Sequence, residues 1–145
     1  MPFSLTSHPL EPTHLKEDLL SSQAGAFSSF EGWVRDHNEG KNVTVLEYEA
    51  YAPLCQQESQ KIFQEARQRF DILDMNVVHR IGKLKFGEMA VWVGVTAAHR
   101  DAAFKACRYL IDEIKHRLPI WKKEYYTNGD SGWVNCQHGS TNHVP

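Results

Sequence analysis

The spacing of apolar side chains predicts two long helices. Over residues 53–70, four apolar positions recur at three- and four-residue intervals and form one face: Ile62, Phe63, Ala66 and Phe70. A longer stripe marks residues 101–118 and consists of Ala103, Cys107, Leu110, Ile111, Ile114 and Leu118. Pro119 follows, and because proline cannot continue a helix, we expect the second helix to end there.

Alternation of apolar and polar residues predicts strands over residues 25–35 and 43–51. We expect these two strands to form a hairpin around the polar loop 36–42. A short strand and a turn of helix are expected in the first twenty residues. Further strands are expected at residues 73–80, 89–96, 120–126 and 133–134, with a loop or small excursion at 82–88. Residues 89–96 are almost wholly apolar, as in a central strand buried on both faces.

These elements predict the fold class α+β, with helices packed on a mostly antiparallel sheet. The chain has 145 residues, a length that fits one domain with a real core. We expect a single domain over residues 1–134, with a small β excursion within it. Residues 135–145 are expected to be a flexible C-terminal tail.

Composition excludes several classes of protein. The net charge of -2 gives no sign of a nucleic-acid binder. No apolar run approaches the ~18 residues of a membrane span, and the start of the chain lacks the pattern of a secretory signal, so we expect a cytoplasmic protein. The three cysteines have no metal-like spacing, and no HxH or HExxH pattern is present, so we expect neither a disulfide nor a metal site.

Three groups of residues could carry chemistry: Trp33-Val34-Arg35 with Asp36-His37-Asn38 at the end of a strand, His99-Arg100, and Lys115 followed across Pro119 by Lys122-Lys123-Glu124. The clearest on physical grounds is His99-Arg100, between the buried strand and the second long helix. The free N–H groups and positive dipole of a helix start, together with Arg and His, make a plausible phosphate site. The alternative is that Arg100 is an ordinary surface residue and His99 belongs to a linker.

Lys115 lies beside the apolar stripe near the end of the same helix. If its ammonium is partly desolvated, its pKa falls and it can act as acid, base or nucleophile. The alternative is a solvated lysine that complements the helix dipole.

Lys122-Lys123-Glu124, the other part of this group, lie on an extended stretch after Pro119. Alternation puts Lys122 and Glu124 on one face and Lys123 on the other. The alternative is an ordinary charged edge strand. Arg35, at the end of an earlier strand, is likewise either an anion ligand or a simple surface charge.

Several blocks of the sequence, in this order, resemble the conserved blocks of the molybdopterin synthase catalytic (large) subunit family. These blocks are GAFSSFEGWVRDHNEG, VVHRIGKLKFGE, VWVGVTAAHRDAAF and DEIKHRLPIWKKE. The resemblance runs from about Gly25 to Val134, and the combination of three such blocks, correctly ordered and spaced, is specific.

The resemblance implies a sulfurtransferase with an α/β hammerhead fold, and makes residues 1–134 the catalytic domain. Members of the family convert cyclic pyranopterin monophosphate (precursor Z) to molybdopterin. Two sulfurs arrive as thiocarboxylates on the C-terminal glycine of a small ubiquitin-like subunit that ends in Gly-Gly. Two large subunits form the centre of a heterotetramer. No cofactor is implied.

The resemblance also assigns site residues. The substrate-binding positions are Trp33, Val34, Arg35, His99, Arg100, Lys115, Lys122, Lys123 and Glu124. Phe30 matches an aromatic of the pocket for the partner's tail. Lys115 is our choice for the acid/base or transient nucleophile, and Lys122 for stabilising negative charge. The family can carry an arginine a few residues after the Trp133-Val134 pair, and the nearest counterpart in this chain is Gln137.

Arg100 and Lys115 stand fifteen residues apart on one predicted helix, roughly 22 Å along its axis. A pterin monophosphate is much shorter, so we expect a homodimer in which each active site is shared between two copies. Two other functions remain open at this point: a non-catalytic partner-binding module and a small phosphate-ester enzyme.

Overall fold

The chain combines two β-sheets with three helices within the part that the computed structural model describes, residues 2–38, 40–127, 129 and 131–135. The helices are α1 (Pro12–Glu17), α2 (Ala52–Arg69) and α3 (Arg100–Arg117). The strands are β1 (Phe3–Thr6), β2 (Ala26–Trp33), β3 (His37–Asn38), β4 (Lys41–Ala50), β5 (Asp74–Arg80), β6 (Gly82–Lys85), β7 (Met89–Ala97), β8 (Ile120–Tyr126) and β9 (Ser131–Asn135). The predicted α+β class is confirmed, as are both long helices, to within one residue at each end.

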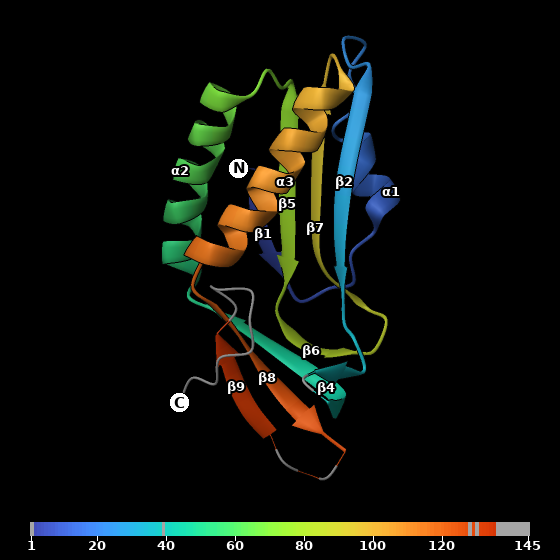
Figure 1. Cartoon of the computed structure of the whole chain (residues 1–145), viewed down its shortest axis with the longest axis vertical. Coiled ribbons are helices and arrows are strands. Elements are labelled where there is room, and N and C mark those ends of the chain that lie inside the picture. Colours follow the sequence, from blue (N-terminus) through green and yellow to red (C-terminus); the bar gives the residue numbers. More distant parts are fainter. Residues whose placement is uncertain (1, 39, 128, 130, 136–145) are drawn as a thin grey trace.

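The larger sheet has the strand order β1-β5-β7-β2, and all its pairings are antiparallel except that of β1 with β5. Figure 1 shows α2 and α3 side by side across one face of this sheet. The apolar stripes of both helices meet alternate residues of β7, Val91, Val93 and Val95, in the main core. The expectation of a central strand at 89–96 is therefore confirmed, and burial on both of its faces explains its wholly apolar sequence.

The segment that contains α1 and Leu19 covers part of the opposite face of the larger sheet. Trp92 and Gly94 point to this face because side chains alternate along a strand. A Cβ at Gly94 would lie 2.3 Å from the Trp92 ring and 2.9 Å from Leu19. Glycine at this position therefore makes room for the indole ring to lie flat along its own strand.

The smaller sheet has the order β3-β4-β8-β9, and β6 also pairs with β4. Figure 1 shows this sheet beyond one end of the larger sheet, where α3 ends. Its own core cluster is formed by Val34, Val43, Leu46, Leu84, Ala90 and Tyr126. The predicted small excursion at 82–88 is thus a strand, β6, followed by a turn.

The expected hairpin between residues 25–35 and 43–51 is wrong. β2 pairs with β7 in the larger sheet, whereas β4 pairs with β6 and β8 in the smaller one. The ladder of β2 shifts register between Gly32 and Trp33, and the chain then passes into the other sheet. Only the short β3 turns back onto the start of β4. Alternation indicates a strand with one wet face, but it does not indicate which strand lies beside it.

The expected tail at 135–145 lies almost wholly outside the described residues, because β9 ends at Asn135. Gln137 lies outside them as well. In the described part of the chain, no helix is both long and apolar enough to cross a membrane.

Candidate active site

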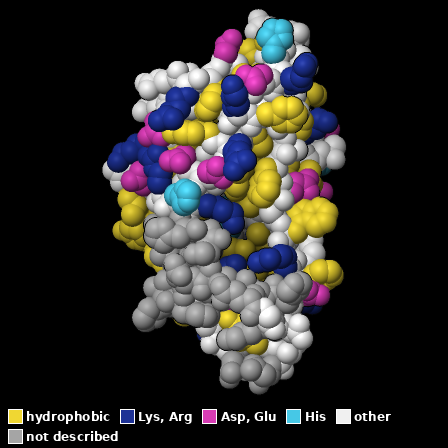
Figure 2. Space-filling model, viewed as in Figure 1, with side chains coloured by type: hydrophobic (Ala, Val, Ile, Leu, Met, Phe, Trp, Pro, Cys, Tyr) yellow, Lys and Arg dark blue, Asp and Glu magenta, His cyan; other side chains and the backbone are white. Residues whose placement is uncertain are grey.

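Lys115 lies in the last turn of α3, where the chain passes from the helices to the smaller sheet. Leu118 caps the helix in an extended conformation, as expected for the residue before Pro119. β8 begins at Ile120, so Lys122 follows after a very short connection. The predicted break at Pro119 therefore brings both lysines to the junction of the two sheets. Figure 2 shows Lys and Arg side chains distributed over this face of the molecule, some of them near its middle.

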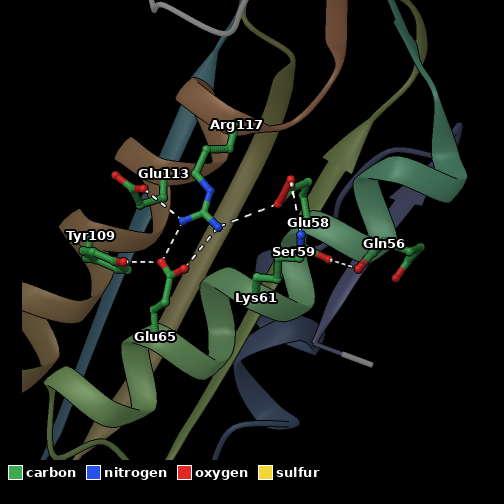
Figure 3. Close-up of polar contacts among 8 residues, drawn as sticks. All are labelled: Gln56, Glu58, Ser59, Lys61, Glu65, Tyr109, Glu113 and Arg117. Carbon is green, nitrogen blue, oxygen red and sulfur yellow. Dashed lines mark hydrogen bonds and ion pairs between the residues drawn. The ribbon is translucent and has the colours of Figure 1, made fainter.

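The last turn of α3 is fastened to α2 by a network of charges around Arg117 (Figure 3). The Arg117 guanidinium donates to both carboxylate oxygens of Glu65, at 2.6 and 3.1 Å, and to Glu113 at 3.2 Å. Tyr109 also donates to Glu65, and Glu58 lies 3.7 Å from the guanidinium. The hydrogen bond from Arg117, followed by that from Tyr109, lowers the pKa of Glu65. This bidentate contact holds the end of α3, and with it Lys115, in place.

Lys122 and Glu124 share one face of β8, as alternation predicted. The Glu124 carboxylate is 2% exposed and accepts a hydrogen bond of 2.8 Å from the Tyr126 hydroxyl. The Lys122 ammonium lies 3.9 Å from the same carboxylate, and its side chain is 20% exposed. A buried carboxylate with these partners holds the lysine head in a fixed direction, which is what a group that stabilises developing negative charge requires.

Lys123 lies on the other face of β8. Its ammonium sits over the rings of Tyr125 and Trp133, at 5.3 and 5.7 Å from their centroids. Within this chain the structure therefore does not bring Lys123 together with Lys122 and Glu124.

His79 joins this group from β5, although the sequence analysis did not single it out. Its ring meets Tyr48 edge-on at 5.0 Å, and Tyr48 is paired in register with Lys122. Because a carbonyl can only accept, the Nδ1–H of His79 donates to the carbonyl of Arg80, at 2.7 Å. Burial lowers the pKa of His79 to about 4, and the nearby charge of Lys115 acts in the same direction. A neutral histidine therefore lies beside the lysine group at neutral pH.

The Trp33-Val34-Arg35 segment approaches the same junction from the end of β2. Val34 is buried in the core cluster of the smaller sheet, which also contains Tyr126. Trp33 is 65% exposed and Arg35 is exposed. The side chain of Val34 is therefore a core group. Phe30, on β2, is 39% exposed.

His99 and Arg100 lie at the other end of α3 and are both exposed. His99 is the N-cap residue, in extended conformation and without a side-chain capping bond. α3 continues unbroken for 18 residues, so Arg100 stands roughly 22 Å from Lys115 along the axis. Figure 1 shows the two ends of α3 at opposite ends of the larger sheet. The structure does not bring these two groups together in one chain.

The cysteines and potential metal ligands form no further centre among the described residues. Burial raises the pKa of the Cys55 thiol to about 11 and also raises that of Cys107, so both are protonated at neutral pH. Cys136 lies outside the described residues. No group of three or more His, Cys, Asp or Glu side chains in the described part of the chain could hold a metal ion.

Comparisons with known proteins agree in sequence and in structure. A family model described as MoaE protein matches residues 5–117. The chain is 52% identical over 135 residues to the molybdopterin synthase catalytic subunit of Synechococcus elongatus, covering 91% of this chain and 82% of that protein.

Two solved structures show the same fold. Molybdopterin synthase from Staphylococcus aureus matches with a TM-score of 0.86 and 33% identity, over 92% of this chain and 96% of that one. A chain from the complex of subunits 1 and 2 of the molybdopterin-converting factor of Helicobacter pylori matches with a TM-score of 0.75 and 22% identity, over 88% of this chain and 87% of that one.

Proposed function

Since the chain belongs to the molybdopterin synthase catalytic subunit family, we propose that it converts cyclic pyranopterin monophosphate to molybdopterin in the cytoplasm. The two sulfurs come from the thiocarboxylated C-terminus of a small ubiquitin-like subunit that ends in Gly-Gly. The single observation that carries the proposal is the ion pair between Lys122 and the buried Glu124 on β8, the strand that begins directly after the end of α3 that carries Lys115.

The cations divide into two roles. Arg35, His99 and Arg100 bind the cyclic phosphate, since guanidinium and imidazole groups suit phosphate oxygens. Lys115 acts beside the carbonyl of the partner's tail as acid, base or transient nucleophile. The thiocarboxylate sulfur bonds to the pterin, water attacks the acyl carbon, and the bond between that carbon and sulfur breaks. Lys122 stabilises the negative charge that develops on the acyl group and holds the released tail carboxylate. Phe30 lines the path of the tail.

Lys115 is exposed in the single chain. Docking of the partner's tail, together with a second copy of the chain, covers it. Removal of water from around the ammonium favours the neutral amine, the form that acts as base or nucleophile.

Each active site is shared between two copies of the chain. His99 and Arg100 of one copy meet Arg35, Lys115 and Lys122 of the other, because the unbroken α3 keeps its two ends too far apart for one small substrate. A two-fold dimer satisfies this requirement twice and places a small subunit at each site.

Complementation tests the shared site. Arg100→Ala and Lys115→Ala chains, each inactive alone, are mixed under conditions that exchange subunits. Half of the dimers are then mixed and have one intact site of two, so up to about a quarter of wild-type activity returns. If subunit exchange is demonstrated by mass spectrometry and no activity returns, the shared site is wrong.

The proposed reaction itself is tested by reconstitution. The purified chain, the thiocarboxylated small subunit and the cyclic pterin are combined, and the dithiolene product is measured. Product requires all three components. Binding of the small subunit without product would favour a non-catalytic docking module, and turnover of a phosphate ester without the thiocarboxylate would favour an unrelated phosphate-ester enzyme.

A further inference from the structure

A buried arginine outside the lysine group connects three separate segments of the chain. Arg80, at the end of β5, has a side chain that is 8% exposed. Its guanidinium donates to the Glu88 carboxylate at 3.1 Å and to the carbonyl of Ser7 at 3.3 Å. Its Nε is buried and has no hydrogen-bond partner among the described residues. Arg80 thus ties the N-terminal segment to the turn between β6 and β7.

Glu88 uses its second carboxylate oxygen to close that turn. This oxygen accepts from the backbone N–H of Lys85 at 2.6 Å, while the backbone N–H of Glu88 donates to the Lys85 carbonyl at 3.1 Å. Gly87 lies between them with φ of 85°, a conformation that favours glycine. The hydrogen bond from Lys85, followed by that from Arg80, lowers the pKa of Glu88. The carboxylate is therefore charged at neutral pH and bridges the arginine and the turn.

The same turn holds Val34 through the backbone. The N–H of Val34 donates to the Glu88 carbonyl at 2.9 Å, and the N–H of Gly87 donates to the Val34 carbonyl at 2.9 Å. The ladder between β2 and β7 has its register shift just before this point and ends at Trp33. Beyond the ladder, these two bonds to the turn direct the backbone that leads into Arg35.

We propose that Arg80 and Glu88 are positioning residues for Arg35. The ion pair between the buried Arg80 and the partly exposed Glu88 holds the turn at residues 85–88. That turn holds the backbone of Val34, and Val34 sets the direction in which Arg35 leaves toward the substrate phosphate. This inference rests on the proposed function, because it assigns a supporting pair to a proposed phosphate ligand.

The position of the pair implies a specific kinetic signature. Lys115 and Lys122 lie on α3 and β8, which the turn at 85–88 does not carry. Loss of the ion pair therefore weakens the phosphate contact and leaves the sulfur-transfer groups in place. The phosphate contact stabilises the bound substrate and the transition state equally. Loss of such a contact raises KM and leaves kcat unchanged.

Glu88→Gln is the decisive variant, because it keeps the shape of the side chain and removes its charge. We expect the KM for the cyclic pterin to rise about tenfold, the effect of weakening one charge-assisted contact, with kcat within about twofold of wild type. Asp74→Asn is the matched control. Asp74 also pairs with an arginine, Arg67 at 3.8 Å, and accepts a backbone N–H, that of Met75 at 2.8 Å, but it lies at the far end of β5. Its KM is expected to match wild type.

A double-mutant cycle separates positioning from general damage. In an Arg35→Ala background, Glu88→Gln is expected to raise KM by less than about twofold further, because the residue it positions is gone. A full tenfold effect in that background would overturn the proposal, as would an unchanged KM in the single variant.

Substitutions at Arg80 supply the rescue. Arg80→Lys keeps a charge that can pair with Glu88, so its KM is expected to lie closer to wild type than that of Arg80→Met. Equal KM values for these two variants, if both fold by circular dichroism, would contradict a role for the ion pair; if Arg80→Met does not fold, the Glu88→Gln cycle decides. Wild-type turnover is measured first: its absence would count against the proposed function, whereas normal turnover with insensitive variants would count against this inference alone.

Discussion

The two ends of α3 carry the proposed chemistry in very different surroundings. At the C-terminal end, Arg117 donates two hydrogen bonds to Glu65 on α2, and the chain passes through Pro119 directly into β8. At the N-terminal end, His99 and Arg100 are exposed, and a nearby ion pair, Lys105–Asp101 at 3.1 Å, lies on the surface. The C-terminal end, called here the built-in end, is attached to α2 and continues into β8, whereas the N-terminal end exposes its cations to solvent.

This difference shows how one helix can serve two sites. The built-in end presents Lys115 and Lys122, and it is attached to α2 through Arg117 and to β8 through Pro119. The exposed end presents an anion-binding pair that is available to another molecule. A rigid helix separates the two by its length, so each end acts in a different active site of the proposed dimer.

The largest expected effect is on the built-in end. Lys115→Ala is predicted to lower the rate of product formation by about 10²-fold or more, the range for loss of an acid/base group. Lys122→Ala is expected to be impaired less. The fold and partner binding are expected to survive because Lys115 is exposed. Rates are measured with saturating partner, and Lys105→Ala, on the same helix near its other end, is the control. Near-normal turnover of Lys115→Ala would remove the lysine from the mechanism.

A second prediction concerns His79, the buried histidine near the built-in end. Burial lowers its pKa to about 4 in the folded chain, against about 6.5 when unfolded. Between these values the unfolded chain binds the proton and the folded chain does not, so stability rises with pH from about 4 to 6.5 and is level above. The effect is on the order of 3 kcal/mol across this window.

The histidine prediction is checked by urea unfolding between pH 4.5 and 7.5. His79→Gln keeps a donor for the Arg80 carbonyl but does not titrate, so its stability should depend less on pH than that of wild type. Protonation of carboxylates such as Glu65 also lowers the stability of the fold in acid, but this effect is the same in wild type and in His79→Gln. His116→Gln, at an exposed histidine of the same helix end, is the control. Identical pH slopes for His79→Gln and wild type would contradict the assignment.

The smallest effect expected is the contrast between the ion pairs at the two ends. Arg117→Met is predicted to lower the free energy of unfolding by about 1–2 kcal/mol, because a partly buried bidentate contact is lost. Asp101→Asn breaks an exposed pair and is predicted to cost less than about 0.5 kcal/mol. Both are measured by urea unfolding at pH 7, in low and high salt, and the Asp101 effect should vanish in high salt. Equal losses would mean that the two ends are held alike.

Sequence patterns recovered the helices well because a helical stripe is a local property. The apolar stripe of α3, from Ala103 to Leu118, and the stop at Pro119 predicted both its extent and its buried face. The same reasoning found β7, because burial on both faces leaves no polar position. It failed for the partner of β2, since alternation looks the same whichever strand lies alongside.

The candidate site was recovered only in part. The alternation of β8 correctly put Lys122 with Glu124 and Lys123 on the opposite face. Substrate binding by Val34 stays a prediction; that its side chain belongs to the core of the smaller sheet was not indicated by the sequence. His79 was missed, although its place at the end of a Val-rich strand, just before an arginine, was the available signal. Its position beside Tyr48 depends on two strands in different sheets.

By itself, the sequence determined the local elements of this protein, their order and the family to which it belongs, because periodicity, proline and conserved blocks are read from neighbouring residues. Only the tertiary structure decided which strands pair, that Arg80 reaches Glu88, and that Arg100 and Lys115 are kept apart by an unbroken helix. The physical reason is that these contacts join residues from different elements. Their geometry follows from packing the whole chain, and no local pattern encodes it.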